Sequence, residues 1–306
     1  MLLSRRRVLA AAAAGAAASG LSACGLSGET AFGSATASDT VLVGSADFTE
    51  SQIIAEVYVA ALKQRGFAAQ SQPAIGAREA FMGALREGSV GVVPDYTGNL
   101  LLYCDGQTDA VTDQQIVAAL KKALPQELAL LTPAAAENKD SMVVTAETAE
   151  RFGLVSLADC SKHQDQLVVG APPEFAERSY GLAGLRQKYG FVPAGFSPIN
   201  DGGGPLTLQA LLDGDIQLAN LFSTDPEIDR HGLVVLEDPR HNFLAQQVVP
   251  VVNARGVSLG VARVLDEVSA VLTTQDLIAF NGRVSGDEKA NAATVAQEWV
   301  QQKLAA

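Results

Sequence analysis

Apolar and polar positions follow one another along the chain in patterns that predict alternating strands and helices. After Thr49 the apolar residues recur at helical spacing, and Gly66 stands where a helix of that length would end. Thr49 with Gln52 three residues later has the form of a capping box, which predicts the start of this helix. The order strand, helix, turn, strand, helix, strand then carries the chain to Tyr96. This alternation predicts parallel strands joined by crossover helices, and therefore an α/β fold.

A later stretch of the chain repeats the same pattern at an almost constant spacing. The segment TVLVGS at Thr40 lies 126 positions before QLVVGA at Gln166. The segment ALREGSVGVVPDYT, which ends at Thr97, lies the same distance before ALLDGDIQLANLFS, which ends at Ser223. We interpret the chain as two copies of one α/β lobe, although generic strand and helix units can also resemble one another by chance.

Tyr96 and Phe222 are equivalent residues under this interpretation, because each follows the end of an apolar strand in its own copy. Ligands of open α/β sheets bind beyond the carboxyl ends of the strands. We therefore predict that both rings face one cleft between the lobes. The alternative is that each ring closes the core of its own lobe, as buried aromatic residues often do.

Two extended segments border the second copy, at residues 141–145 and 246–253, and we interpret them as the crossings between the lobes. Helices predicted at 261–272, 274–283 and 292–304 then complete the first lobe. The predicted division is residues 39–143 and 249–306 for lobe 1 and 144–248 for lobe 2. Two crossover strands of this kind form a hinge that permits closure around a ligand.

The N-terminus has the pattern of an export signal. Three arginines at positions 5–7 precede an apolar, alanine-rich run at 8–18, which is too short for a stable transmembrane helix. The small residues before Cys24 resemble a bacterial lipobox, so we predict a signal peptide at 1–23 and a lipid on Cys24. Residues 24–38 are predicted to be a flexible tether at the outer face of the cytoplasmic membrane. The export route, general or twin-arginine, stays open.

Charge and cysteine content narrow the class of partner. The chain has 22 basic and 34 acidic residues, and loss of the three signal arginines leaves a formal net charge of about −15. This charge argues against nucleic acid as a partner and mildly favours a cationic or zwitterionic ligand. Cys104 and Cys160 form an even pair in an exported chain, and they are either a disulfide or two buried thiols. The cysteines and histidines lack metal-ligand spacing, so no metal and no cofactor are expected.

An enzyme is an alternative because Gly256, Ser258 and Gly260 spell the nucleophile-elbow pattern. That fold requires its histidine after the serine, whereas all three histidines of the chain come before it. Ser258 is better interpreted as a helix N-cap, and no enzymatic activity is expected. The glycine run at 202–204 precedes a predicted helix but lacks the residues of a phosphate-binding loop, so we interpret it as a turn.

Four segments together resemble a known family. They are GSADFTE at 44–50, AREAFMGALREGSVGVVPDYTG at 77–98, GAPPEF at 170–175 and LANLFSTDP at 218–226. They are similar to the substrate-binding proteins of osmoprotectant ABC importers, the glycine betaine, choline, carnitine and proline betaine binders of the OpuC and ProX type. The resemblance implies a two-lobed type II periplasmic-binding fold, and a monomer that delivers its ligand to a permease and ATPase pair. A ligand-sensing receptor domain would use the same lobes and is the alternative.

The resemblance also implies a cage of aromatic rings around a quaternary ammonium group. Tyr96 matches one cage tyrosine and Phe222 another. The two remaining positions fall at or beside Ser141 and at Leu182, and neither residue is aromatic. Cage rings each contribute about 0.5 to 2 kcal/mol to cation binding. We therefore expect a ligand that is larger or less cationic than glycine betaine, unless Tyr180 supplies a substitute ring.

The remaining candidate ligand contacts also come from the resemblance. Arg178 matches the arginine that takes a ligand carboxylate, and Thr97 and Asn99 belong to or follow the YTG segment. Asp47 is a further candidate near the end of the first strand. Glu50, three residues later, is interpreted as an acid that complements the dipole at the start of a helix.

Overall fold

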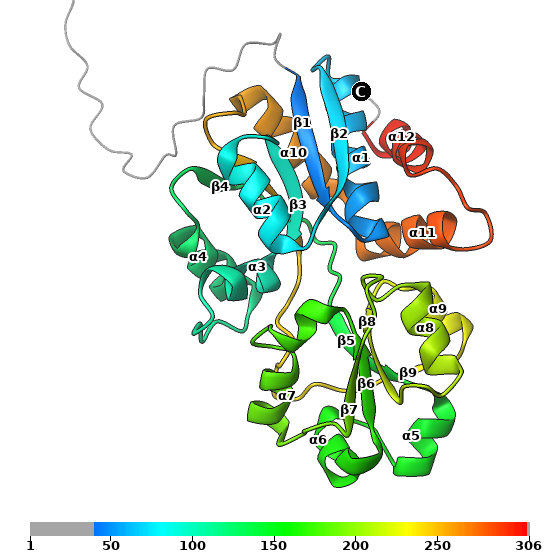
Figure 1. Cartoon of the computed structure of the whole chain (residues 1–306). Helices are drawn as coiled ribbons and strands as arrows, with labels where there is room; N and C mark the ends of the chain where they lie inside the picture. The colour runs from blue at the N-terminus through cyan, green and yellow to red at the C-terminus, as the bar shows by residue number, and fades with distance from the viewer. Residues whose placement is uncertain (1–39, 305–306) are drawn as a thin grey trace, which may run out of the picture.

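The computed structural model describes residues 40–304, which fold into two α/β lobes, one above the other in Figure 1. The predicted signal peptide, the tether and Cys24 lie outside the described residues. The first lobe is built from two stretches of chain. Its first stretch contains β1 (Val41–Ala46), α1 (Thr49–Gln64), β2 (Ala69–Gly76), α2 (Arg78–Glu87), β3 (Val92–Tyr96), α3 (Thr97–Cys104), α4 (Asp113–Ala123) and β4 (Leu128–Leu130).

The second lobe follows as one continuous stretch, and the chain then returns to the first. The second lobe contains β5 (Asp140–Val144), α5 (Ala146–Phe152), α6 (Leu157–Cys160), η1 (Ser161–Gln166), β6 (Val168–Ala171), η2 (Pro173–Ala176), α7 (Leu182–Tyr189), β7 (Gly195–Pro198), α8 (Pro205–Leu212), β8 (Leu218–Phe222), α9 (Glu227–Arg230) and β9 (Val234–Val235). The returning stretch contains β10 (Val248–Asn253), α10 (Leu259–Val271), α11 (Thr274–Ser285) and α12 (Ala292–Lys303).

The two sheets have the same topology, as the internal repeat predicted. The strand order is β2-β1-β3-β10-β4 in the first lobe and β7-β6-β8-β5-β9 in the second. The repeated segments occupy the same places, so that β1, β2 and β3 correspond to β6, β7 and β8. The register agrees as well, because Tyr96 pairs with Val248 in one sheet and Phe222 pairs with Asp140 in the other.

One strand of each sheet departs from the expected parallel arrangement. β10 runs antiparallel to β3 and β4, and β5 runs antiparallel to β8 and β9. Each is the strand by which the chain enters a lobe from the other one. Such a strand starts at the cleft, whereas the strands that precede the crossover helices end there, so its direction is reversed.

The sheet topology corrects the predicted division of the chain. The boundary at residue 143 falls inside β5, which belongs to the second sheet through its pairing with β8. Residues 141–145 are therefore a sheet strand and not a crossing. The segments that connect the two sheets are residues 131–139 and 236–247. The other boundary stands one residue from the start of β10, and the helices expected after it are α10, α11 and α12.

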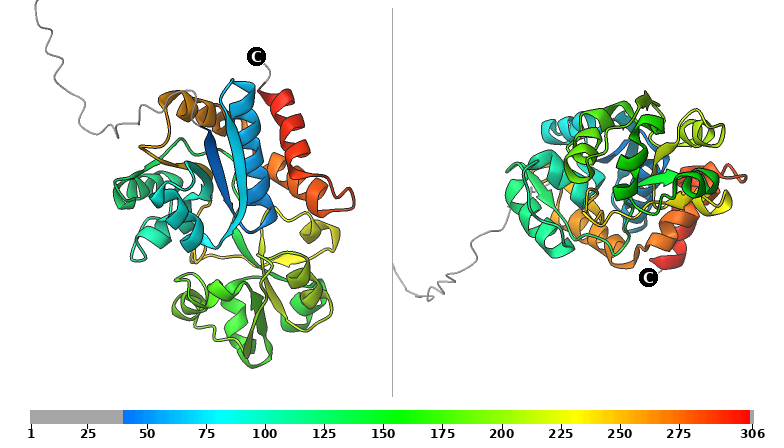
Figure 2. Two further views of the ribbon diagram at one scale, coloured as in Figure 1. Left: turned by 45° about the horizontal axis from the view of Figure 1, so that its top comes forward. Right: turned by 90° about the horizontal axis from the view of Figure 1, so that it is seen from below.

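Separate hydrophobic cores hold the two lobes. In the first lobe, α1, α10, α11 and α12 cover one face of the sheet, where Ile53, Tyr58 and Trp299 are buried. The other face packs against α2, α3 and α4 through Met82, Leu100 and Ile116. The second lobe likewise has a core on each face of its sheet, and helices flank that sheet on both sides (Figure 2). Because each lobe is stabilised internally, the space between them is free to serve a ligand.

Some local predictions need correction. α1 begins after Phe48, which makes no side-chain cap, and Gln52 donates to the Asp47 carbonyl, so the predicted capping box is absent. Ser258 does cap α10, because its hydroxyl accepts from the Val261 amide. Cys104 lies in the first lobe and Cys160 in the second, both as free thiols. Burial raises the pKa of Cys104 to about 11 and that of Cys160 to about 12.

Candidate ligand-binding site

A cavity lined by aromatic residues, which we call the main cavity, lies between the lobes, beyond the carboxyl ends of β1, β3 and β8. It has a volume of about 690 Å³, which includes space open to solvent. Residues of both lobes and of a connecting segment form its wall. They are Ala46, Asp47, Phe48, Ala77, Arg78, Phe81, Tyr96, Asn99, Asn138, Asp140, Pro172, Glu174, Phe175, Arg178, Tyr180, Gly202, Asn220 and Phe222. The cavity therefore lies beyond the carboxyl ends of strands in both sheets, where the internal repeat predicted a cleft.

Three aromatic rings meet in this cavity. Phe48 follows β1, and its ring centroid lies 6.0 Å from that of Tyr96 and 5.3 Å from that of Phe222. Tyr96 and Phe222 are the last residues of β3 and β8, so the rings come from both lobes. The structure places Tyr96 and Phe222 together as the repeat predicted. Phe48 was missed, although it stands directly before α1 in one of the segments that carry the family resemblance.

Glu50 connects the ring wall, which consists of Phe48, Tyr96 and Phe222, to other parts of the molecule. Its buried carboxylate accepts hydrogen bonds from the Tyr96 hydroxyl at 2.6 Å, Asn138 Nδ2 at 2.7 Å, Thr224 Oγ1 at 2.5 Å and Asn281 Nδ2 at 2.7 Å. Tyr96 and Asn281 belong to the first lobe, Asn138 to a connecting segment and Thr224 to the second lobe. Glu50 is therefore a contact between lobes, and burial together with this carboxylate raises the pKa of Tyr96 well above its ordinary value.

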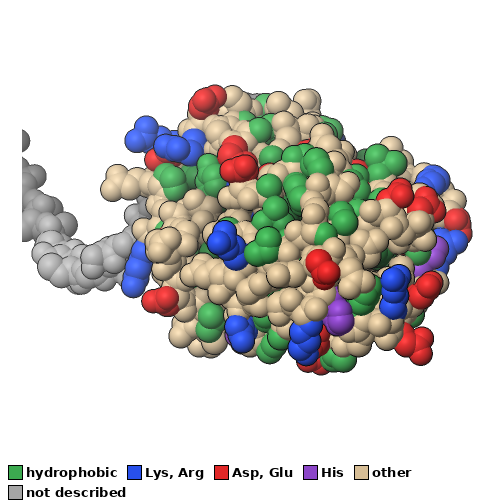
Figure 3. Space-filling view, turned by 60° about the horizontal axis from the view of Figure 1, so that its bottom comes forward, with side chains coloured by type: hydrophobic (Ala, Val, Ile, Leu, Met, Phe, Trp, Pro, Cys, Tyr) green, Lys and Arg blue, Asp and Glu red, His purple; other side chains and the backbone are tan. Residues whose placement is uncertain are grey.

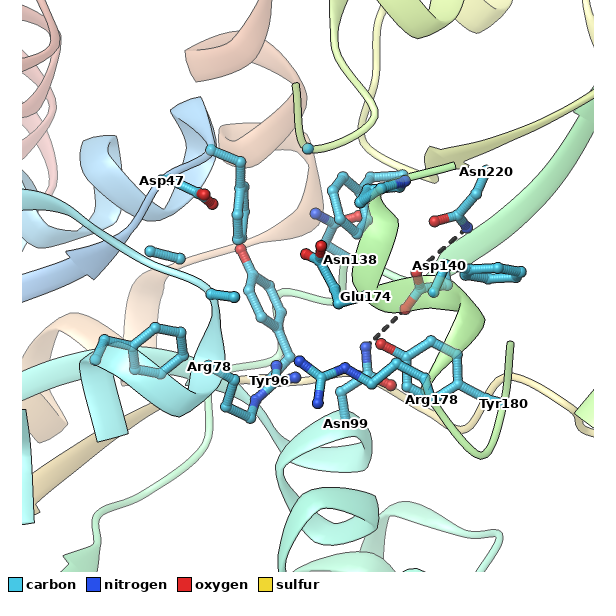
Figure 4. Close-up of a pocket in the computed structure, with 18 residues that line it drawn as sticks. Asp47, Arg78, Tyr96, Asn99, Asn138, Asp140, Glu174, Arg178, Tyr180 and Asn220 are labelled. Atoms are coloured by element: carbon cyan, nitrogen blue, oxygen red, sulfur yellow. Dashed lines mark hydrogen bonds between the residues drawn. The ribbon is translucent and has the colours of Figure 1, made fainter. Parts of the chain in front are cut away.

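Asp140, the first residue of β5, is a second buried carboxylate, and it lies in the cavity wall. It accepts hydrogen bonds from Asn99 Nδ2 at 2.7 Å and Asn220 Nδ2 at 3.3 Å, as the dashed lines in Figure 4 show. Burial raises the pKa of Asp140, against the opposing effect of the two amides and of Arg78 and Arg178. No sequence pattern selects Asp140, because the family resemblance points to its neighbour Ser141 as the cleft residue.

Two arginines line the cavity, and each already has an anionic partner. The Arg78 guanidinium donates to the Asp95 carboxylate, with Nη2 2.7 Å from Oδ1 and Nε 3.0 Å from Oδ2. Burial opposes the charge of Arg78, but Asp95 outweighs burial and raises the pKa of Arg78. Arg178 forms a two-pronged ion pair with Glu79 of the first lobe, which raises the pKa of Arg178 and lowers that of Glu79. Arg178 thus lies in the wall, as predicted, but bound to a carboxylate of the protein.

Three further predicted residues lie in the cavity wall. Asn99 is held there by its backbone, which donates to Gln246 Oε1 of a connecting segment at 3.0 Å. Asp47 is exposed at the rim, and its side chain makes no hydrogen bond with a described residue. Tyr180 presents its ring beside Asp140 (Figure 4), and burial followed by the charge of Asp140 raises the pKa of Tyr180. Tyr180 therefore adds a further ring to the cavity wall, which Phe81 and Phe175 also line.

Three predicted residues are absent from the wall, and their positions are corrected. Ser141 follows Asp140 on a strand, and successive side chains of a strand point to opposite faces, so Ser141 turns away and donates to the Lys139 carbonyl. Leu182 begins α7 and packs against the core of the second lobe. Thr97 is fully buried, and its hydroxyl accepts a hydrogen bond from the Gln247 amide of the second connecting segment.

Two glycines let chain segments pass close to the site. A Cβ on Gly98 would lie 2.4 Å from the Ala245 carbonyl oxygen, so the glycine after Tyr96 and Thr97 makes room for the returning segment. Gly202 has a φ of 66°, and a Cβ there would lie 2.8 Å from Cβ of Phe48 in the other lobe. The glycine run is therefore a turn, as predicted, that brings the second lobe against the ring wall. A second cavity of about 1010 Å³ lies on the far side of Phe48 and Phe222.

The described residues carry no cluster of three or more His, Cys, Asp or Glu side chains with an arrangement suited to a metal ion. None of the described helices has the length and hydrophobicity needed to span a bilayer. On the face of the second lobe shown in Figure 3, basic and acidic side chains are interspersed.

Comparison with known proteins agrees with this geometry. The profile of the substrate-binding domain of ABC-type glycine betaine transport systems matches residues 39–302. The chain belongs to this family. Members are solute-binding proteins of ABC transporters that act outside the cytoplasm, and their role is not enzymatic, in agreement with the sequence analysis.

Individual relatives cover most of the chain. The glycine betaine-binding protein YehZ of Escherichia coli K12 is 28% identical, over 87% of this chain and 92% of the relative. A glycine-betaine-binding protein of Pseudomonas aeruginosa is 26% identical, over 82% of this chain and 84% of the relative. The crystal structure of a glycine betaine/carnitine/choline ABC transporter protein superposes with a TM-score of 0.67 at 21% identity, covering 86% of this chain and 98% of that one. The fold is therefore the two-lobed type II periplasmic-binding fold.

Proposed function

We propose that the main cavity binds a small organic cation of the quaternary-ammonium class and that lobe closure presents this ligand to an ABC permease. The proposal takes the ligand class from relatives named for glycine betaine and carnitine binding. The transport role follows from membership in the family. The aromatic residues of the cavity are the physical support for the ligand class.

The observation that carries the proposal is the meeting of Phe48, Tyr96 and Phe222 in one cavity. A trimethylammonium group cannot donate hydrogen bonds, so a protein recognises it with the negative faces of aromatic rings. Because two rings belong to the first lobe and one to the second, the cage is complete only when the lobes close. Ligand binding and closure would then be one event.

The expectation of a larger or less cationic ligand loses its basis. It rested on Ser141 and Leu182 as non-aromatic members of the cage, and neither lines the cavity. Six Phe and Tyr rings line the cavity instead: Phe48, Phe81, Tyr96, Phe175, Tyr180 and Phe222. A ring cage for a small cation therefore needs no further aromatic residue.

Titration calorimetry of the purified protein with glycine betaine, choline and carnitine tests this function. Phe48→Leu removes one ring and keeps an apolar side chain, so we expect binding weaker by roughly 5- to 30-fold, the equivalent of about 1–2 kcal/mol. Phe152→Leu, in the second lobe and outside both cavities, is the matched control. Binding of none of the three ligands, or equal affinity of the two variants, would refute the ring cage.

We also propose that the mature protein is a monomer anchored by a lipid on Cys24. The lipobox-like residues before Cys24 and the tether-like composition after it support this. Metabolic labelling with a fatty-acid analogue should label the wild-type protein and leave Cys24→Ala unlabelled and released from the membrane. Recovery of the unlabelled variant in the membrane fraction would contradict the anchor, and a dimer in sedimentation experiments would contradict the monomer.

A further inference from the structure

The cavity has no unpaired cation to offer a ligand among the described residues. Arg78 is bound by Asp95 within the first lobe, and Arg178 is bound by Glu79 across the lobes. The Arg78 and Asp95 side chains are only 11% and 1% exposed, so water does little to weaken that pair. Each guanidinium keeps N–H groups that its pair does not use, so a ligand carboxylate would have to share its cation with a carboxylate of the protein.

Carboxylates, in contrast, line the cavity without cationic partners. Asp47, Asp140 and Glu174 form no ion pair with any described residue, and they come from the first lobe, from β5 and from η2. Figure 4 shows these three side chains around the same space as the rings. Asp140 is the most constrained of them, because it is 4% exposed and its hydrogen-bond partners among the described residues are two neutral amides.

Two buried oxygens of the same wall also lack donors. Asn99 Oδ1 and Asn138 Oδ1 have no hydrogen-bond partner among the described residues, in side chains that are more than nine-tenths buried. Their orientation is fixed, since Asn99 Nδ2 donates to Asp140 and Asn138 Nδ2 donates to Glu50. Buried acceptors without donors are uncommon in folded proteins and point to a missing partner. The partner that suits them carries N–H or O–H groups.

The fold does not require an acidic residue at position 140. The corresponding position of the first lobe is Val248, because Val248 pairs with Tyr96 as Asp140 pairs with Phe222. A buried valine completes the equivalent sheet there. The carboxylate of Asp140 is therefore an addition specific to the second lobe, and it faces the cavity.

We propose that the site selects an organic cation without a carboxylate, whose tail donates hydrogen bonds to Asp140 while its head group lies against Phe48, Tyr96 and Phe222. This inference rests on the proposed function, since it uses the same ring cage. It sets the preferred ligand apart from glycine betaine, whose carboxylate tail finds no unpaired arginine and is repelled by Asp140. A tail that bears an ammonium group fits the three unpaired carboxylates best.

Three ligands with the same trimethylammonium head group isolate the tail. They are glycine betaine with a carboxylate, choline with a hydroxyl, and (2-aminoethyl)trimethylammonium with an ammonium group. We expect calorimetric Kd values for the ammonium tail to be at least about tenfold lower than for the carboxylate tail, the effect of one charge-assisted hydrogen bond. Choline should lie between them. Tighter binding of glycine betaine than of both others would overturn the inference and leave the ring cage intact.

Substitutions at position 140 test the residue itself. Asp140→Asn keeps the shape and an acceptor oxygen, and should remove the preference by weakening the ammonium tail about tenfold without weakening glycine betaine. Asp140→Val copies the equivalent position of the first lobe and should do the same, so the test does not depend on one variant folding. Asp225→Asn, the same charge change outside the main cavity, is the matched control and should keep the preference.

The outcomes separate the two proposals. If none of the three ligands binds, the proposed function fails and this inference fails with it. If they bind and Phe48→Leu weakens all three equally, while the preference survives both Asp140 variants, the function stands and the role of Asp140 is refuted. Loss of the preference in both variants, with its retention in Asp225→Asn, supports Asp140 as the residue that determines specificity.

Discussion

Glu50 and Asp140 are both buried carboxylates beside the ring wall, 3% and 4% exposed, yet their surroundings differ. Glu50 receives four hydrogen bonds from four separate parts of the chain. Asp140 receives two, from Asn99 and Asn220. A carboxylate has about four lone-pair sites, so the described residues saturate Glu50 and leave Asp140 with capacity to spare. The difference separates a carboxylate that holds the structure together from one that is available to a ligand.

The position of Glu50 supports its structural role. It is the second residue of α1, where the partial positive charge of the helix N-terminus favours an anion. Its partners come from the first lobe, a connecting segment and the second lobe, so one side chain joins the parts that must meet on closure. Asp140 has no such helix, and only neutral donors contact it.

The largest expected effect comes from removing the saturated carboxylate. Glu50→Ala leaves the donors of Tyr96, Asn138, Thr224 and Asn281 without their partner. Each buried unsatisfied group costs about 1–3 kcal/mol, and water entering the gap offsets part of the sum, so we expect the free energy of unfolding to fall by roughly 3 kcal/mol or more. Urea unfolding monitored by circular dichroism measures this, with Glu87→Ala on the surface as control. An unchanged midpoint would show that Glu50 is not a structural centre.

The next prediction separates two roles of Tyr96. Its hydroxyl donates a hydrogen bond to Glu50, and its ring lines the cavity. Tyr96→Phe should lower the free energy of unfolding by about 1 kcal/mol and leave ligand affinity within about threefold. Tyr96→Leu should lose a comparable amount of stability and also bind the cation about 5- to 30-fold more weakly, because the ring is gone. Parallel calorimetry and unfolding experiments on both variants provide the comparison. Equal affinities of the two variants would remove Tyr96 from the cage.

The contrast between these residues also shows what sequence could and could not predict. Tyr96 and Phe222 were found because the repeat relates them and because strand ends are where α/β proteins bind ligands. Glu50 was interpreted as a helix-terminal acid, since its partners lie 46, 88, 174 and 231 positions away and no local pattern connects them. Asp140 was missed by one residue, because the face that a strand side chain occupies depends on pairing register.

A smaller effect concerns the charge of Asp140 in the unliganded protein. Its pKa in the folded state is raised, chiefly by burial, so stability falls as the pH rises from the ordinary carboxyl pKa through the raised pKa, and the loss is complete above it. Below the ordinary carboxyl pKa of about 4, Asp140 is protonated in both folded and unfolded states and the penalty disappears. Asp140→Asn should therefore be more stable than wild type at pH 7, with a higher Tm, and the gain should disappear near pH 3.5.

Thermal melts of the wild type and the variant between pH 3.5 and 7.5 measure this difference. In the variant, the amides of Asn99 and Asn220 can still donate to the remaining oxygen at position 140. Arg78 and Arg178 are the cations whose charge lowers the pKa of Asp140, and both stay charged throughout this range. A stability gain that is independent of pH would attribute the change to packing and not to ionisation. A loss of stability at neutral pH would show that Asp140 is structural, and the comparison with Glu50 would then break.

The smallest effect isolates the contact that Glu50 makes with the second lobe. Thr224→Val removes the hydroxyl that donates to Glu50 and accepts from Asn281, and keeps the volume of the side chain. Because Thr224 is the only one of the four donors to Glu50 that lies in the second lobe, the first lobe should keep its stability while closure weakens.

We expect ligand to dissociate about 2- to 10-fold faster from this variant in stopped-flow measurements, with the association rate unchanged. This factor is the equivalent of one hydrogen bond, neutral or charge-assisted. Small-angle scattering should show a larger radius of gyration for the ligand-free variant if Glu50 holds the lobes closed. An unchanged dissociation rate would limit Glu50 to the first lobe and leave closure to the rings and to the pair of Arg178 with Glu79.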